Sequence, residues 1–231
     1  MTGVKNIISE DAMANAFEKS FLRSSSLSDL PKFNDVFREF EAKQGVPDFV
    51  ATTGKKLNKR LLNVVNLAYK KFGERSLLVL KEMKGGSPRR VETISKKTGL
   101  SDTEVQKILT YLTTERIAQS SSSGSFKLYK KYCYTGLDFW AFELKLSNWR
   151  RALFQSLQSS AFASYKIVVF PENKKKVIEK NTTVFQRFGI GIIFFDYATD
   201  SANVFLRPRQ KRPSSDLHYV YAILKSASFH L

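Results

Sequence analysis

The sequence is short of the residues on which several classes of protein depend. One cysteine and two histidines among 231 residues exclude an internal disulfide and a cysteine-rich zinc site. The histidines, His218 and His230, offer no spacing typical of a nucleophile and its base, which argues against a hydrolase triad. The longest apolar run, Ile190–Phe195, is too short to cross a bilayer, and residues 1–23 lack the apolar core of a signal peptide. We therefore expect a soluble cytoplasmic protein with no membrane partner.

Acidic residues are scarce relative to basic ones. The chain has 38 Lys and Arg against 21 Asp and Glu, a formal net charge of +17, which favours a polyanionic partner. The surplus is uneven: residues 1–48 have 6 basic and 8 acidic side chains, residues 49–136 have 18 and 6, and residues 137–231 have 14 and 7. The basic middle block predicts a separate module with its own ligand. An apolar content of 42% allows each part a core.

The middle block contains segments with helical spacing of apolar residues, followed by two short strands. The helices are expected at residues 57–72, 75–83, 91–97 and from 101 to about 112, and the strands at 117–119 and 126–129. Gly99 ends the third helix, and Ser101 with Glu104 forms a capping box that begins the fourth. Helix, helix, turn, helix and hairpin are the order of a winged helix. The block resembles winged helix-turn-helix DNA-binding domains over roughly residues 75–132.

This resemblance implies that the helix after Ser101 enters a major groove of DNA while the hairpin contacts the backbone. Short polar or basic side chains at that helix suit base edges and phosphates, and they are Ser101, Thr103, Gln106, Lys107 and Thr110. Basic side chains around it would neutralise phosphates, and they are Arg89, Arg90, Lys96, Lys97, Lys127, Lys130 and Lys131. The alternatives are a protein-interaction or structural insert, and an ordinary solvated helix face.

The flanking segments predict an α/β fold. Helices are expected from Ser9 onward and at residues 148–163 and 175–188, and strands at 36–40, 48–52, 137–146, 165–170, 190–197 and 203–206. Residues 165–170 are nearly all apolar, which indicates a central strand buried on both faces. In the strand 137–146, alternation places Trp140, Phe142, Leu144 and Leu146 on one face and Ala141, Glu143 and Lys145 on the other.

A Glu-x-Lys triplet means little alone, and this chain has four of them. Three lie before a turn, at a helix end and in a basic loop, and these are Glu41-Ala-Lys43, Glu82-Met-Lys84 and Glu172-Asn-Lys174. Only Glu143-Leu-Lys145 lies on a strand whose opposite face is strongly apolar, so burial holds its charged face in one place. That context singles out Glu143 and Lys145.

Together with Pro47-Asp48 on an earlier strand, this order resembles the PD-(D/E)XK, or restriction-endonuclease-like, nuclease superfamily. The resemblance covers residues 9–52 and 137–170, and it implies a mixed sheet flanked by helices and interrupted by an inserted winged-helix domain. The expected division is residues 1–54 and 135–231 for the nuclease core and residues 55–134 for the insert. Carried over residue by residue, the family's functional positions correspond to Asp48, Glu143, Lys145, Glu10 or Glu18, and Gln155.

In that family Asp48 and Glu143 would bind Mg²⁺ or Mn²⁺, since carboxylate oxygens suit hard cations, and Lys145 would position water or offset charge. The expected function is a Mg²⁺-dependent DNA endonuclease with double-stranded DNA as its expected substrate, and the homodimer common among nucleases that cut both strands is an expectation from enzyme type alone. Other readings are a non-catalytic, sequence-specific DNA-binding regulator on a degenerate nuclease scaffold, or an RNA-binding protein. For Glu143 and Lys145 the alternative is a surface ion pair on an edge strand, and for Glu10 it is a first-turn helix acid.

Overall fold

A computed structural model of the chain describes residues 9–22, 29–56, 58–83, 86–134 and 136–229. The chain divides into two compact units. Residues 1–53 and 138–214 form the first, here called the core unit, and residues 54–137 and 215–231 form the second, the helical unit. This division differs from the expected one at the C-terminus, because residues 215–231 group with the helical unit rather than with the core.

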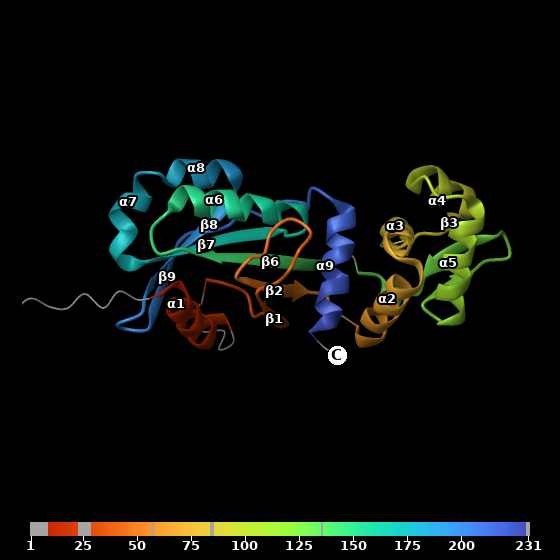
Figure 1. The fold of residues 1–231 in the computed structure, drawn as a ribbon, viewed down its shortest axis with the longest axis horizontal. Coiled ribbons are helices and arrows are strands. Elements are labelled where there is room, and N and C mark those ends of the chain that lie inside the picture. Colours follow the sequence, from red (N-terminus) through yellow and green to blue (C-terminus); the bar gives the residue numbers. More distant parts are fainter. Residues whose placement is uncertain (1–8, 23–28, 57, 84–85, 135, 230–231) are drawn as a thin grey trace, which may run out of the picture. The chain divides into compact units, whose positions relative to one another are not determined.

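A mixed six-stranded sheet forms the centre of the core unit. In spatial order its strands are β1 (Asp35–Arg38), β2 (Phe49–Gly54), β6 (Leu137–Leu144), β7 (Tyr165–Pro171), β8 (Ile190–Asp196) and β9 (Ser201–Leu206). The central strands β6, β7 and β8 are parallel, while β1 with β2 and β8 with β9 are antiparallel. Helices cover both faces of the sheet (Figure 1). This is the α/β architecture with flanking helices that the sequence predicts.

Two apolar clusters fix the helices on the sheet. On one face, α1 (Glu10–Phe17) and the π-helical turn η1 (Glu18–Leu22) pack on residues of β2, β6, β7 and β8, with the rings of Phe17 and of Phe195 on β8 5.7 Å apart. On the other face lie α6 (Trp149–Gln158) with η3 (Ser159–Ala161), then η4 (Glu172–Lys174), α7 (Lys175–Glu179) and α8 (Thr182–Phe188). Each central strand is therefore covered on both sides, as its continuous apolar sequence requires.

The prediction of a single helix over residues 175–188 is wrong, since two short helices occupy this segment. Asn181 ends the first of them. Its side-chain Nδ2 donates to the Val177 carbonyl at 2.9 Å, and its backbone N–H donates to the Ile178 carbonyl at 2.9 Å. Asparagine competes with helical hydrogen bonding in this way, so it interrupts a helix that apolar spacing alone would extend.

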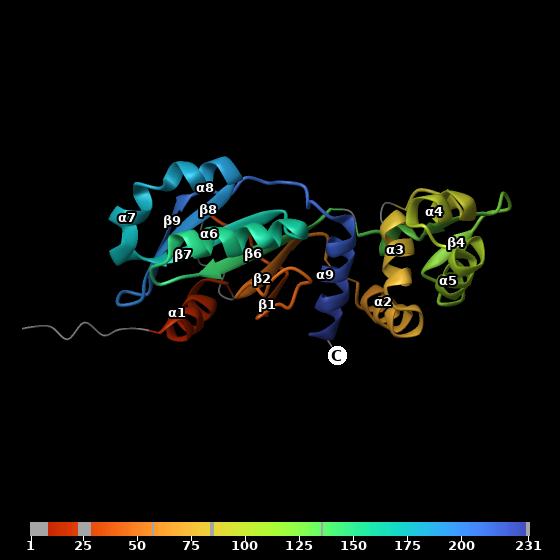
Figure 2. The ribbon, with the colours of Figure 1, turned by 45° about the horizontal axis from the view of Figure 1, so that its top comes forward.

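In the described part of the helical unit, a run of helices is followed by a small hairpin (Figure 2). They are α2 (Lys59–Phe72), α3 (Glu74–Met83), α4 (Val91–Thr98) and α5 (Asp102–Thr114), with β4 (Ala118–Ser120), β5 (Ser125–Leu128) and the turn η2 (Lys130–Tyr132) after them. A two-residue strand, β3 (Arg89–Arg90), completes an antiparallel sheet in the order β3-β5-β4. Gly99 adopts φ +74° after α4, and Ser101 and Glu104 form a complete capping box at α5, so both predicted boundaries are confirmed.

The sequence did not predict the last helix, α9 (Asp216–Ser228), which packs against α2 and α3. Its buried Tyr219 hydroxyl lies 2.8 Å from the Leu137 carbonyl and 3.1 Å from the Tyr134 carbonyl. The Tyr134 hydroxyl in turn donates to the Leu80 carbonyl at 2.6 Å. These bonds join α9 to the end of the inserted segment and, through Tyr134, to α3. Within the part of the chain described here, no helix has the length and apolar character to cross a membrane.

Candidate active site and basic groove

The structure brings together four of the predicted catalytic residues of the core unit. Glu143 lies on β6, Lys145 directly follows that strand, Asp48 directly precedes β2, and Glu10 is the first residue of α1. The Lys145 Nζ lies 3.2 Å from Glu10 Oε2 and 3.3 Å from Glu143 Oε1. One ammonium group therefore joins two acids that are separated by more than half of the chain.

Backbone groups of β6 and the residues after it hold the other two acids in place. Asp48 Oδ2 accepts a hydrogen bond from the Leu144 N–H at 2.7 Å, which ties the start of β2 to the neighbouring strand. Glu10 Oε1 accepts from the Leu146 N–H at 3.4 Å, a weaker bond. The Glu143-Leu-Lys145 segment thus supplies two of the four candidate side chains and contacts the other two through its main chain or through Lys145.

The charged pair on this strand is buried because the strand is internal. Strand β6 lies between β2 and β7, and Glu143 and Lys145 are only 3% and 7% exposed. The opposite face of β6 contributes Trp140, Phe142 and Leu144 to the aromatic cluster under α1, as alternation predicts. An exposed ion pair on an edge strand, the alternative interpretation, is therefore wrong.

The three buried or half-buried ionisable groups alter each other's protonation. Burial, and then the charge of Asp48, raise the pKa of Glu143 to about 7. Burial also raises the pKa of Asp48, although the Leu144 N–H and the Lys145 charge oppose this. Burial would lower the pKa of Lys145, but the charges of Asp48, Glu143 and Glu10 outweigh it and raise that pKa. The site therefore concentrates negative charge that a single lysine only partly balances.

The residues present suit a hard divalent cation. Glu143 Oε1 is buried without a well-aligned hydrogen-bond donor among the described residues, although Lys145 stands at ion-pair distance from it. A cation between Asp48 and Glu143 would relieve the repulsion that raises the Glu143 pKa. The described residues include no group of three or more His, Cys, Asp or Glu side chains arranged around one metal position. The protein would accordingly supply two carboxylates, a number that is common for Mg²⁺.

The fifth predicted residue, Gln155, lies on α6, which covers the same side of the sheet as Glu143. Its Oε1 is buried and has no hydrogen-bond partner in the described part of the chain. The loop before Asp48 also rests on this helix: a Cβ at Gly45, which adopts φ +90°, would lie 2.9 Å from Gln158 Oε1. Helix α6 therefore supports the Asp48 loop and holds an unused amide acceptor in the interior.

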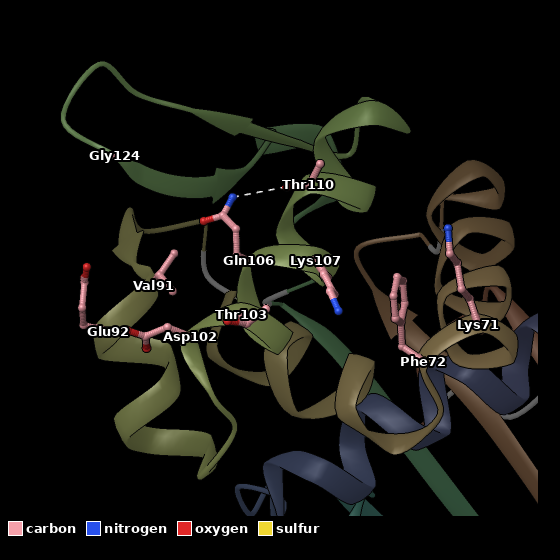
Figure 3. Close-up of a pocket in the computed structure, with 10 residues that line it drawn as sticks. All are labelled: Lys71, Phe72, Val91, Glu92, Asp102, Thr103, Gln106, Lys107, Thr110 and Gly124. Atoms are coloured by element: carbon pink, nitrogen blue, oxygen red, sulfur yellow. Dashed lines mark hydrogen bonds between the residues drawn. The ribbon is translucent and has the colours of Figure 1, made fainter.

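In the helical unit, α5 carries the residues that are predicted from the sequence to contact bases. Thr103, Gln106, Lys107 and Thr110 are exposed and line a groove of about 850 Å³. Gln106 Nε2 donates to Thr110 Oγ1 at 3.2 Å, which orients the amide (Figure 3). The groove also includes residues that the sequence did not select, and these are Lys71, Phe72, Val91, Glu92, Asp102 and Gly124.

Two of these additional residues follow from the packing of α2. Lys71 Nζ lies 5.4 Å from the centre of the Phe72 ring and 5.1 Å from that of Tyr111, so aromatic faces hold its charge beside the groove. On the opposite side of the groove, Glu92 and Asp102 add negative charge, as Figure 3 shows. A Lys-Phe pair at the end of a helical stripe is the signal that could have identified the first wall, but no local pattern indicates that α2 and α5 are neighbours.

The predicted phosphate-binding residues differ in their exposure and in whether another side chain already pairs with them. Arg90, Lys96, Lys130 and Lys131 are exposed, and Lys127 is half-buried on β5. Lys97 Nζ is ion-paired with Glu82 at 3.2 Å, and Arg89 Nε is buried without a hydrogen-bond partner among the described residues. The Ser101 hydroxyl bonds with Glu104 as the helix cap, so its observed role is structural.

Comparison with known proteins gives no relative from which a function could be transferred. No protein-family model, no curated protein and no solved structure matches the chain. The functional argument therefore rests on the side-chain geometry of the two units.

Proposed function

We propose that the protein is a Mg²⁺-dependent DNA endonuclease, with a PD-(D/E)XK-like site in the core unit and a winged-helix-like DNA-binding module in the helical unit. The observation that carries the proposal is the convergence of Glu10, Asp48 and Glu143 around Lys145. Buried charges are costly, and a fold rarely retains several of them without a task. Perturbed carboxylates beside a lysine at the end of a central strand support hydrolysis of a charged substrate.

The reaction would be hydrolysis of a phosphodiester: a water oxygen forms a bond to phosphorus, and the bond from phosphorus to one ester oxygen breaks. A bound Mg²⁺ would lower the pKa of the water and stabilise the charge on the phosphorus oxygens. Lys145, fixed by Glu10 and Glu143, would orient the water and offset the charge that develops on the phosphate. Gln155 has a free buried acceptor that could orient the same water.

The helical unit would supply affinity. It has 19 basic and 7 acidic side chains, a net charge of +12, and its groove along α5 has the polar and basic groups that contact base edges and phosphates. Its order of helices and hairpin is the one that places a recognition helix in a major groove. Binding of this kind weakens steeply with salt, because DNA releases counterions when lysine and arginine neutralise its phosphates.

The test is incubation of the purified protein with linear, supercoiled, branched and single-stranded DNA in Mg²⁺, Mn²⁺ or chelator. We expect metal-dependent cleavage by the wild type and none by Glu143→Gln. Glu172→Gln, from another Glu-x-Lys triplet in which Glu172 is partly exposed and pairs with Lys175, is the matched control and should cleave normally. Full cleavage by Glu143→Gln would overturn the proposal.

The competing functions predict different results in the same experiment. Tight sequence-specific binding without cleavage in any metal would favour a non-catalytic regulator. Stronger competition by RNA than by duplex DNA would favour an RNA ligand.

The oligomeric state needs a separate measurement, the mass of the protein in solution. A homodimer would allow one site to act on each strand.

A further inference from the structure

A single lysine is buried in the otherwise apolar central strand β7. Lys166 is 2% exposed and shares a sheet face with Val168 and Phe170, which belong to the apolar cluster beneath α6 and α8. Its neighbours in the sheet are Ala141 on β6 and Ile190 on β8. The candidate active site does not use this residue, since the nearby Glu143 is paired with Lys145.

Among the residues that the structure describes, Lys166 has no compensating acid. No carboxylate forms an ion pair with it in the described part of the chain, and the charge that acts on it most clearly is that of Lys211. Burial and then the Lys211 charge lower the pKa of Lys166 to about 8, so the amine is still largely protonated at neutral pH. A buried cation beside a second cation is unfavourable unless an anion joins them.

The segment that contains Lys211 is held firmly against this part of the sheet. We call residues 207–214 the basic strap. Three backbone hydrogen bonds fix it: Arg209 N–H to the Gly189 carbonyl at 3.0 Å, Lys211 N–H to the Ser164 carbonyl at 2.9 Å, and Ser214 N–H to the Ser160 carbonyl at 2.9 Å. The strap is therefore not simply a solvated loop.

Side-chain packing places the strap's cations next to the residues that precede β7 and β8. A Cβ at Gly189 would lie 2.9 Å from Lys211 Cε and 3.3 Å from Arg209 Cβ, so the Lys211 side chain and the first side-chain carbon of Arg209 lie beside this glycine. Two acids contact the strap through other residues: Asp138 accepts from Gln210, and Asp29 pairs with Arg207. Arg209, Lys211 and Lys166 thus remain as three neighbouring cations without a described carboxylate partner.

We propose that Lys211 and Arg209, with Lys166 beneath them, form an anion site for a phosphate of the DNA backbone. The strap residues would contact the phosphate, and Lys166 would strengthen the positive field from below. The choice of DNA as the source of the phosphate rests on the proposed function, whereas the anion site itself does not. This site would give the core unit its own hold on the strand that it cuts.

The test compares Lys166→Met, Lys211→Met and the control Lys180→Met, an exposed lysine elsewhere in the core unit. DNA affinity is measured against salt concentration. Lys211→Met should weaken binding about 3–10-fold and reduce the slope of log K against log salt by about 0.9, the value for one lost phosphate contact. Lys166→Met should also weaken binding and yet raise the Tm, because it removes an uncompensated buried charge. A purely structural lysine would not weaken binding while its loss stabilises the fold.

A second readout uses inorganic phosphate at constant ionic strength. Phosphate should raise the Tm of the wild type and of Lys180→Met, but not that of Lys211→Met. If both lysine variants match Lys180→Met in DNA affinity, salt slope and phosphate response, the anion site is wrong even if the protein cleaves DNA. If phosphate stabilises only proteins with Lys211 while DNA affinity is unchanged, the site stands and DNA is not its ligand. That site would also survive a finding that the protein does not cleave DNA.

Discussion

The two units place their charges differently. The helical unit has a net charge of +12, whereas the core unit, with 19 basic and 14 acidic side chains, has only +5. Yet the charged side chains that are buried within the described residues, Glu143, Lys145 and Lys166, all belong to the core unit. Exposed charges cost little and attract a polyanion from a distance, while buried charges are costly and are sensitive to single neighbours. Net charge thus indicates where a ligand is attracted, and burial indicates where chemistry is possible.

The largest expected effect is on cleavage, in the unit with the smaller charge. Asp48→Asn should reduce the rate by about 10³-fold, because it removes one of the two carboxylates proposed to bind the metal. DNA binding should change little, since the helical unit is untouched. Single-turnover assays and binding titrations measure the two effects separately. Asp196→Asn, a partly exposed aspartate of the same unit, is the control. A comparable loss in the control, or normal cleavage by Asp48→Asn, would remove the distinction between the units.

The next effect concerns the dependence of stability on pH. The folded-state pKa of Glu143, about 7, lies above its ordinary value of 4.5, so the folded state binds the extra proton. Its contribution to stability is complete below pH 4.5 and is lost as pH rises through about 7, by roughly 3 kcal/mol. Urea unfolding at several pH values would show this loss. Glu143→Gln should lack it, and Asp48→Asn should move it to lower pH, because the Asp48 charge raises that pKa.

An identical pH profile for wild type and Glu143→Gln would contradict the pKa assignment. Glu104 in the helical unit can be compared with Glu143, because hydrogen bonds from Ser101 lower the pKa of this surface carboxylate. Glu104 therefore stabilises the fold at higher pH and loses that contribution as pH falls below its ordinary value. The two acids change stability in opposite directions, as expected for a buried and a capping carboxylate.

A smaller effect is expected on binding through the groove. Lys107→Ala should weaken DNA binding several-fold and reduce the salt slope by about one contact. The cleavage rate at saturating protein should be unchanged, since the core site is intact. Fluorescence anisotropy over a range of salt concentrations measures the slope. Lys180→Ala provides the control, and equal slopes for the two variants would exclude the groove as the DNA-binding surface.

The smallest effect separates capping from DNA contact at Ser101. Ser101→Ala should lower the free energy of unfolding by about 1 kcal/mol, whereas Ser101→Gly should lower it by only a few tenths. If the hydroxyl only caps α5, both variants should bind DNA normally once folded. Thermal unfolding and binding at low temperature measure these effects. Equal losses of affinity in both variants would restore the predicted DNA contact.

Local patterns were sufficient to predict most helices and strands and two residues of the candidate site, Glu143 and Lys145. Alternation along residues 137–146 identified the buried and charged faces of β6, and the Ser101 capping box located α5. The spatial arrangement of the site residues was harder to predict. Nothing local shows that Glu10 reaches Lys145, because that contact depends on how α1 crosses the sheet. The resemblance to a known family supplied Glu10 as a candidate, and only the structure places it at the site.

Other features were missed because long-range contacts decide them. Helix α9 is stabilised by α2 and α3 and by the Tyr219 hydrogen bonds, which no local pattern reveals. Lys166 was visible in the sequence as one lysine in a run that is otherwise apolar, and that exception was the available signal. A buried strand that tolerates a charge merits the same attention as a motif.

The most direct test of the central claim is a single-turnover cleavage assay at increasing protein concentration, with Glu143→Gln and Lys107→Ala side by side. We predict that Lys107→Ala reaches the wild-type rate when protein saturates the DNA, while Glu143→Gln remains inactive at every concentration and binds DNA normally. Recovery of Glu143→Gln at high protein concentration would show that the buried acid serves binding rather than chemistry. That result would contradict the separation of attraction and cleavage between the two units.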